Sequence, residues 1–181
     1  DRPATGLGPV KAPQQAWELD LGAVVFARPT LGKNAENETV AYVGTHAGRF
    51  SGVVTDGPNA GSIVTDLTLG GMVWATAAQD ARGHLYVGAD DDHLYAIDPA
   101  ESRIVWKLQL GDCRPARAPG PEGARCDVDG GPTLGPDGDL YVGADGVYRI
   151  STQGEIRWHW PADEDARARH VFSSPLVTAD G

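Results

Sequence analysis

The sequence holds two cysteines, Cys113 and Cys126, whose thiols could form a disulfide or bind a metal. Both lie in the stretch 112–130, which is rich in proline and glycine and has no strand or helix pattern. A disulfide closing this loop would stabilise the fold by about 2–4 kcal/mol and requires an oxidising compartment. Two reduced thiols are the alternative, and a metal pair is disfavoured because no histidine or third cysteine accompanies them. We predict a structural disulfide between Cys113 and Cys126.

The densest acidic cluster is Asp90, Asp91 and Asp92, followed by His93. Carboxylate oxygens on a loop could hold Ca²⁺. However, consecutive side chains point in different directions, and the interleaved Asp, Asn and Gly spacing of a calcium loop is missing. The sequence therefore favours a solvated hairpin loop here. Neighbouring repeats offer no Ser/His/Asp or Cys/His grouping, so no catalytic, cofactor-binding or metal-binding residue is predicted.

Composition and charge restrict the class of protein. The 181 residues suit one domain, with 41% hydrophobic residues and many turn formers, 24 glycines and 13 prolines. The formal net charge of −10 argues against a nucleic-acid partner, which would be bound through Lys and Arg. No apolar run reaches the roughly 18–20 residues that a membrane span needs. We expect a turn-rich globular domain without a nucleic-acid partner and without a membrane span.

Three short phrases recur in a fixed order along the chain. The first is Tyr-Val-Gly, which starts at Tyr42, Tyr86 and Tyr141. The second is a Trp with alternating Leu residues and a final Gly, which starts at Trp17 and Trp106, with Thr65 in place of the Trp in one copy and a divergent copy at Trp158. The third is Pro-Thr-Leu-Gly, which starts at Pro29 and Pro132, with a divergent copy at Ser174. Such cycling indicates a repeat protein.

Each cycle has the pattern of four short strands separated by turns. In the best-preserved cycle the apolar runs are 72–79, 85–88, 94–98 and 104–110, all enriched in Val, Ile, Tyr and Trp. A unit of about 40–50 residues with four antiparallel strands is typical of a β-propeller blade. We predict an all-β fold, a β-propeller built of four-stranded antiparallel blades with no long helix.

The repeat also sets the expected boundaries. Blades are expected at about 24–70, 72–111 and 131–161, with 112–130 as an inserted loop and 1–16 as a Pro/Gly-rich N-terminal extension. Two flanking strands are expected, 17–22 as the outer strand of a preceding blade and 171–181 as the start of a further one. Four blades is the smallest propeller size, and an open arc of three exposes strand edges. The expected partners are the remaining blades of a longer polypeptide, or other chains that complete the ring.

The stretch 96–106 resembles the tryptophan-docking motif of the PQQ-like (quinoprotein-type) propeller repeat, in which an Ala, an Asp, a Thr-Gly turn, a basic residue and a Trp follow one another. Glu101 and Ser102 stand where this repeat has Thr-Gly. The third cycle is similar, with Gly154 at the turn and a Trp at the end, and the resemblance spans about 17–181.

The resemblance implies a structural docking role for Trp17, Trp106 and Trp158. A large flat ring at a fixed place in the outer strand fills the gap between blades, while its indole N–H finds a backbone carbonyl. The alternative, that these rings stack a sugar or quinone, is disfavoured because their spacing follows the blade repeat.

The remaining tryptophans, Trp74 and Trp160, fall outside this register and are the better candidates for a functional Trp, although core packing is favoured for both. Thr65 stands at the docking position of the first cycle. Because it has less volume than an indole, we expect that blade junction to be looser or plugged by another side chain.

The resemblance implies two functions from different classes. The favoured one is a non-catalytic propeller in a periplasmic, cell-surface or secreted setting, a scaffold that binds a protein or polysaccharide through the loops at one end of the ring and needs no cofactor. The alternative is a fragment of a quinone (PQQ)-dependent alcohol or sugar dehydrogenase, which would use PQQ and calcium. Such dehydrogenases hold the quinone over a ring formed by adjacent cysteines, whereas Cys113 and Cys126 are far apart in this sequence.

Overall fold

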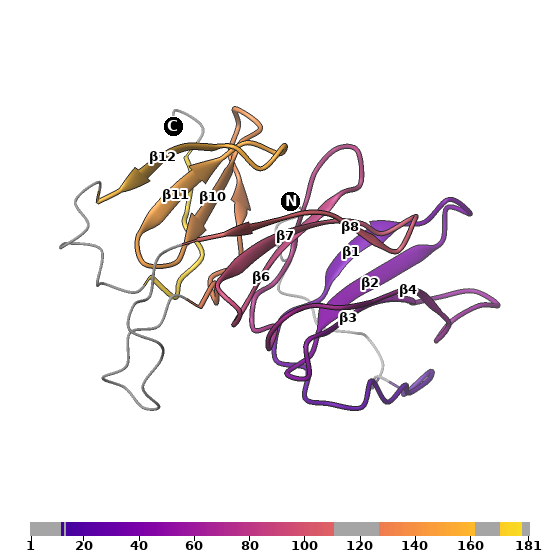
Figure 1. The fold of residues 1–181 in the computed structure, drawn as a ribbon. Helices are drawn as coiled ribbons and strands as arrows, with labels where there is room; N and C mark the ends of the chain where they lie inside the picture. Colours follow the sequence, from indigo (N-terminus) through magenta and orange to yellow (C-terminus); the bar gives the residue numbers. More distant parts are fainter. Residues whose placement is uncertain (1–11, 13, 111–126, 162–170, 179–181) are drawn as a thin grey trace.

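The computed structural model describes residues 12, 14–110, 127–161 and 171–178, which form twelve β-strands and no helix (Figure 1). The strands make three four-stranded antiparallel sheets, which we number as blades 1 to 3. Blade 1 consists of β1 (Thr30–Lys33), β2 (Thr39–Gly44), β3 (Arg49–Val54) and β4 (Ile63–Thr68). Blade 2 consists of β5 (Ala78–Gln79), β6 (Leu85–Ala89), β7 (His93–Asp98) and β8 (Arg103–Gln109). Blade 3 consists of β9 (Thr133–Leu134), β10 (Leu140–Gly143), β11 (Val147–Ile150) and β12 (Ile156–Trp160).

The prediction of an all-β fold made of four-stranded antiparallel blades is confirmed. No helix long and apolar enough to cross a membrane occurs in the described part of the chain.

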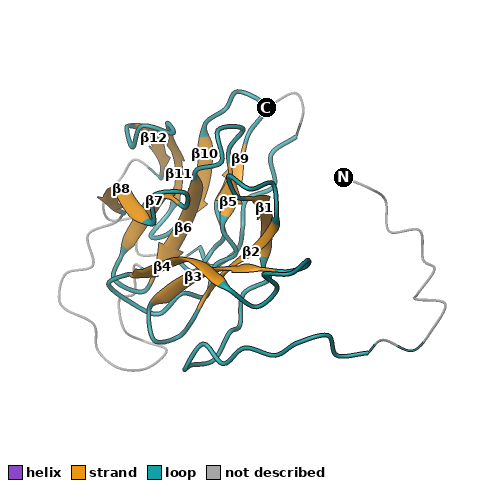
Figure 2. Cartoon of the chain, turned by 90° about the vertical axis from the view of Figure 1, so that its right-hand side faces the viewer, coloured by secondary structure: helices purple, strands orange, loops and turns teal. Residues whose placement is uncertain are grey.

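The first strands of the three blades lie side by side, with β5 between β1 and β9 (Figure 2). Threonine hydroxyls tie each first strand to the next segment along the arc. The Thr30 hydroxyl donates to the Ala77 carbonyl at 2.6 Å, and the Thr133 hydroxyl donates to the Pro175 carbonyl at 2.6 Å. The blades therefore follow one another around an arc whose inner edge is formed by their first strands.

The hydrophobic core lies between the blades. Side chains alternate across a strand, so neighbouring residues of β6 face opposite blades. Leu85 and Val87 pack in the cluster shared with blade 1, whereas Tyr86 packs in the cluster shared with blade 3. All five residues of β6 are buried as a result. This double burial explains why the middle blade has a continuous apolar strand where a one-sided sheet would alternate with polar residues.

The glycine of each Tyr-Val-Gly repeat lies against a valine of the next segment along the arc. The three pairs are Gly44 with Val73, Gly88 with Val128, and Gly143 with Val171. A Cβ on Gly44 would overlap the side chain of Val73, and a Cβ on Gly143 would lie 2.5 Å from the Val171 carbonyl oxygen. Only glycine allows so close an approach, which explains why the repeat keeps it.

The two flanking strands expected at 17–22 and 171–181 are not formed in the described residues, because 17–22 and 171–178 carry no β-ladder. A strand requires backbone hydrogen bonds to a neighbouring strand. Neither segment has such a neighbour in the described part of the chain. Segment 171–178 instead follows the edge of blade 3, where the Val171 amide donates to the Ala144 carbonyl at 2.8 Å.

We predict that Gly44→Ala destabilises the fold by about 1–3 kcal/mol, because the new methyl group overpacks the contact with Val73. Chemical denaturation measures the change. The matched control is Gly44→Ala in a Val73→Gly background, which removes both the Cγ1 and the Cβ that the new methyl group would overlap and should reduce the cost of the alanine. Equal costs in the two backgrounds would contradict the close-approach explanation.

Candidate functional site

Four segments precede the first strand of a blade or follow blade 3, and we call them the lead-in segments: 24–29, 72–77, 127–132 and 171–175. Three of them pair with the preceding blade through a valine amide. Val73 donates to Thr45, Val128 to Ala89 and Val171 to Ala144, with N···O distances of 3.0, 3.4 and 2.8 Å. The segments therefore occupy equivalent places, and their residues can be compared position by position.

The residue that follows this valine is Trp74, Asp129 or Phe172. Phe26 holds the same position in segment 24–29, because the Val24 carbonyl accepts from the His46 amide as the Met72 carbonyl accepts from the Asp90 amide, each at 3.0 Å. The aromatic side chains at this position are exposed to 71% at Phe26, 37% at Trp74 and 49% at Phe172. Three of four equivalent positions thus present a large apolar ring to solvent.

Two of these rings form a cluster with His46. The Phe26 and Trp74 rings meet edge to face at a centroid distance of 5.4 Å, and the His46 ring lies 3.9 Å from that of Trp74. The Trp74 indole N–H donates to a carboxylate oxygen of Asp90 at 3.1 Å. These contacts hold the Trp74 ring in one orientation while leaving part of it exposed, as in a preformed binding surface.

Acidic groups from blade 2 and from the lead-in segment 127–132 meet beside the Trp74 ring. Carboxylate oxygens of Asp90, Asp127 and Asp129 lie within 4.8 Å of one another, and Asp127 is buried. Among the described residues this is the group that could hold a metal ion, since hard cations such as Ca²⁺ take carboxylate oxygens. Sequence reasoning missed Asp127 and Asp129 because they lie far from Asp90 along the chain. Alignment of the lead-in segments is the signal that could have found them.

The prediction of a solvated hairpin loop at 90–92 is wrong in part, because Asp90, Asp91 and Asp92 are all half-buried. The reason is that Asp91 belongs to a hydrogen-bonded chain that runs through Tyr95 to the segment after blade 1. Its carboxylate accepts a hydrogen bond from the Tyr95 hydroxyl, which in turn accepts one from the Gly70 amide at 3.1 Å. Burial, followed by the hydrogen bond to Asp91, raises the pKa of Tyr95 to about 12.

We predict a loss of stability in alkali that depends on Tyr95. Its pKa is raised in the folded state from an ordinary value of 10.0, so the stabilisation is complete below pH 10 and is lost as the pH rises through about 12. The free energy of unfolding, measured by denaturant titration from pH 9 upwards, should fall less steeply in Tyr95→Phe than in the parent protein. Identical slopes would contradict the assignment.

The structure places two of the three predicted docking tryptophans against a backbone carbonyl. The Trp17 indole N–H donates to the Thr55 carbonyl and the Trp106 indole N–H to the Thr152 carbonyl, both at 3.1 Å. Trp106 belongs to blade 2 and Thr152 to blade 3, so this bond crosses a blade junction. Trp158 is 42% exposed, and its ring meets that of Tyr141 edge to face.

Three other predicted residues lie elsewhere. Trp160 is 69% exposed at the end of β12. Cys113 and Cys126 lie outside the described residues, so their disulfide stays a prediction.

The docking role of Trp106 predicts that Trp106→Ala destabilises the fold by about 3–5 kcal/mol, because it removes a large, partly buried ring packed against the core between blades 2 and 3. Thermal and denaturant unfolding measure the loss. Trp158→Ala is the matched control and should cost less, because that ring is more exposed. An unchanged thermal midpoint for Trp106→Ala would refute the docking role.

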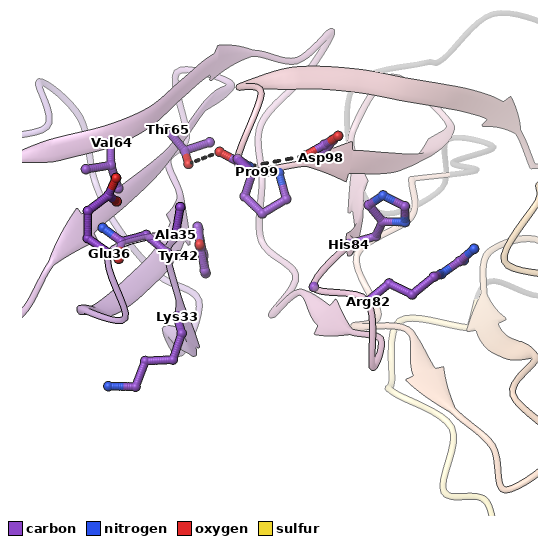
Figure 3. Close-up of a pocket in the computed structure, with 13 residues that line it drawn as sticks. Lys33, Ala35, Glu36, Tyr42, Val64, Thr65, Arg82, His84, Asp98 and Pro99 are labelled. Carbon is purple, nitrogen blue, oxygen red and sulfur yellow. Dashed lines mark hydrogen bonds between the residues drawn. The ribbon is translucent and has the colours of Figure 1, made fainter.

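Thr65 occupies the position in β4 that Trp106 occupies in β8. Thr65 pairs across the ladder with Gly52, which faces Tyr42, just as Trp106 pairs with Ala96, which faces Tyr86. With a threonine at this position, a cavity of about 470 Å³ remains between blades 1 and 2 (Figure 3). Three turns line it, at 33–36, 82–84 and 98–100, together with Tyr42, Val64 and Thr65.

Comparisons with solved structures place this arrangement among known folds. BamB from Moraxella catarrhalis superposes with a TM-score of 0.64 at 18% identity over 90% of this chain and 47% of BamB. The computationally designed protein Ika4 superposes with a TM-score of 0.62 at 13% identity over 90% of this chain and 86% of Ika4. BBS1N, crystallised in complex with ARL6DN, gives 0.52 at 20% identity over 79% of this chain and 41% of its own. Neither protein-family models nor curated protein sequences give a match.

The likeness to BamB and BBS1N, together with the three antiparallel blades, defines the described residues as an incomplete β-propeller. The chain spans about half of BamB. At these identities the likeness shows the fold alone.

Proposed function

We propose that this chain is part of a non-catalytic PQQ-like β-propeller that acts as an extracytoplasmic scaffold and binds a protein partner through its lead-in segments. The observation that carries the proposal is the row of exposed rings at equivalent positions, Phe26, Trp74 and Phe172. Exposed aromatic rings on a rigid framework are typical of the residues that dominate protein–protein binding energy.

Contacts around Trp74 favour a binding role over simple core packing. The Trp74 indole N–H donates a hydrogen bond to Asp90, and the ring packs against that of His46. Because the side chain is already held in one orientation, it loses little conformational entropy on binding. Its exposed part lies next to the more exposed ring of Phe26. A partner that covers both rings would bury apolar surface that the described fold leaves in water.

The charge of the same face indicates what kind of protein would bind. The whole chain carries a formal net charge of −10, and the half-buried Asp90 carboxylate lies at the aromatic cluster. A partner surface with apolar side chains surrounded by Lys and Arg complements this arrangement. Such binding weakens as salt screens the opposite charges.

The setting and the completing blades follow from other features. A disulfide between Cys113 and Cys126 would suit a periplasmic, cell-surface or secreted location. Because three blades are fewer than the smallest propeller has, the remaining blades of a longer polypeptide, or a completing chain, belong to the proposed assembly.

The proposal predicts that a photoreactive phenylalanine at position Phe26 cross-links a protein in the source cells, whereas one at Val105, exposed on β8, does not. With the captured partner purified, Phe26→Ala and Trp74→Ala should bind about 10- to 30-fold more weakly than the parent protein, as expected for central interface residues. Val105→Ala is the control and should bind normally. Thermal midpoints verify that the variants are folded.

Three results would contradict the proposal. Equal affinities of all variants would show that the exposed rings of the lead-in segments are not part of the interface. A polysaccharide in the cross-linked product would change the class of partner. A bound chromophore and dye-linked alcohol or sugar oxidation after addition of PQQ and Ca²⁺ would instead support the quinone-dependent dehydrogenase.

A further inference from the structure

The cavity between blades 1 and 2 lies where an indole ring packs elsewhere in the repeat. Trp17 and Trp106 each donate an indole N–H to the carbonyl of a turn between the third and fourth strands of a blade, at Thr55 and Thr152. In blade 2 the corresponding carbonyl belongs to Pro99, directly after β7. No tryptophan among the described residues donates to it.

Two polar residues replace the indole and its glycine neighbour at this junction. The Trp106 ring lies over Gly154, and the Trp17 ring lies near Gly61. In blade 2 the residue before the fourth strand is Ser102, whose hydroxyl accepts a hydrogen bond from the Asp66 amide at 2.9 Å. The Thr65 hydroxyl donates to the Pro99 carbonyl at 2.8 Å (Figure 3). The Ser102 hydroxyl also donates to the Asp66 carbonyl at 3.2 Å. These three bonds hold the blades together without filling the space of an indole.

The walls of the cavity have the chemistry that packs against indoles in the other two blades. Tyr86 and Tyr141 place their rings 5.9 and 6.1 Å from those of Trp106 and Trp158. Tyr42, the equivalent tyrosine, forms the buried floor of the cavity with Thr65. Val64, Pro99 and Ala100 form its more accessible apolar wall. A volume of about 470 Å³ is large enough to admit an indole ring.

From this geometry we infer that the cavity binds a tryptophan side chain supplied by a partner polypeptide. The indole ring lies against Tyr42 and Pro99, and its N–H donates to the second lone pair of the Pro99 carbonyl, beside the bond from Thr65. At the rim, the Lys33 ammonium donates to the Asn37 carbonyl, and Arg82 and Asp98 form ion pairs with Asp80 and Arg103. Glu36, which makes no ion pair among the described residues, is the rim charge that would attract a basic residue next to the tryptophan of a peptide (Figure 3).

This cavity is separate from the surface formed by the lead-in segments. The cavity is lined by the turns between the first and second strands of two blades, whereas the lead-in segments contact the turns between the second and third strands, at the other ends of the same strands. Failure of one proposed binding site in its experiment would therefore not bear on the other.

The test titrates N-acetyl-tryptophanamide into the ¹⁵N-labelled chain and follows amide chemical shifts. We expect saturable shifts at Val64, Thr65 and Ala100. N-acetyl-phenylalaninamide, which lacks the indole N–H donor, should bind about two- to tenfold more weakly, the usual net effect of one hydrogen bond. Absence of saturable shifts at these residues would overturn the inference.

Two variants locate the binding site. Ala100→Tyr places a ring at the mouth of the cavity, on an exposed turn, and should abolish the shifts. Ala81→Tyr, on an exposed turn that lines the neighbouring groove, is the matched control and should leave them unchanged. Thr65→Trp should abolish binding and raise the thermal midpoint; if this variant does not fold, Ala100→Tyr still decides. Unchanged shifts in Ala100→Tyr would place the probe elsewhere and refute the inference.

A second arm distinguishes a polypeptide from a small aromatic molecule. A capped tripeptide with a central tryptophan and Lys on either side should bind several-fold more tightly than N-acetyl-tryptophanamide and than the same tripeptide with Asp in place of Lys, because Glu36 at the rim would pair with a lysine flank. If neither tripeptide binds more tightly than the capped amino acid, the inference that a polypeptide occupies the cavity is wrong.

Discussion

The arc depends on the contact between the Tyr-Val-Gly glycine of one blade and a valine of the segment that follows it. Because Gly44 has no side chain, the backbone of 72–77 comes close enough for the Val73 amide to reach the Thr45 carbonyl. The same contact recurs at Gly88 and Gly143 and sets the separation of successive blades. It also places the residue after each valine beside the turn between the second and third strands of a blade. Trp74 and Phe172 therefore lie on the same face of the arc.

The position of a strand between neighbouring blades decides which of its side chains can be polar. Blade 2 is covered on both faces, so β6 is apolar along its whole length and Tyr86 and Val87 serve two different cores. The fourth strands lie at the outer edge, and β4, β8 and β12 are mostly exposed. The fold is therefore held by interfaces between blades more than by any one sheet, as in other repeat architectures in which each unit contacts its neighbours.

What could be predicted from the sequence is what one repeat determines by itself. The strands around Tyr86 and Trp106 follow from local apolar patterns and turn residues, and the structure has them. The meeting of Asp90 with Asp127 and Asp129 depends on how two blades sit against each other, which periodicity within a blade does not report. The two flanking strands predicted at 17–22 and 171–181 are not formed in the described residues for a related reason. Their residues have a strand pattern, but a ladder needs a neighbour, and segment 171–178 bonds to the end of blade 3 instead.

The junction at Thr65 shows how such a repeat can acquire a cavity without losing its arc. An indole ring over glycine stabilises a junction by packing, whereas Thr65 and Ser102 stabilise it with three hydrogen bonds to the backbone of the facing blade. Hydrogen bonds are directional and need no volume, so the blades keep their separation while the space of the ring stays open. Because each junction contributes its own share to stability, the strong Trp106 junction can support a neighbour that is less completely packed. A change at two positions of the repeat is therefore enough to convert a structural contact into a cavity.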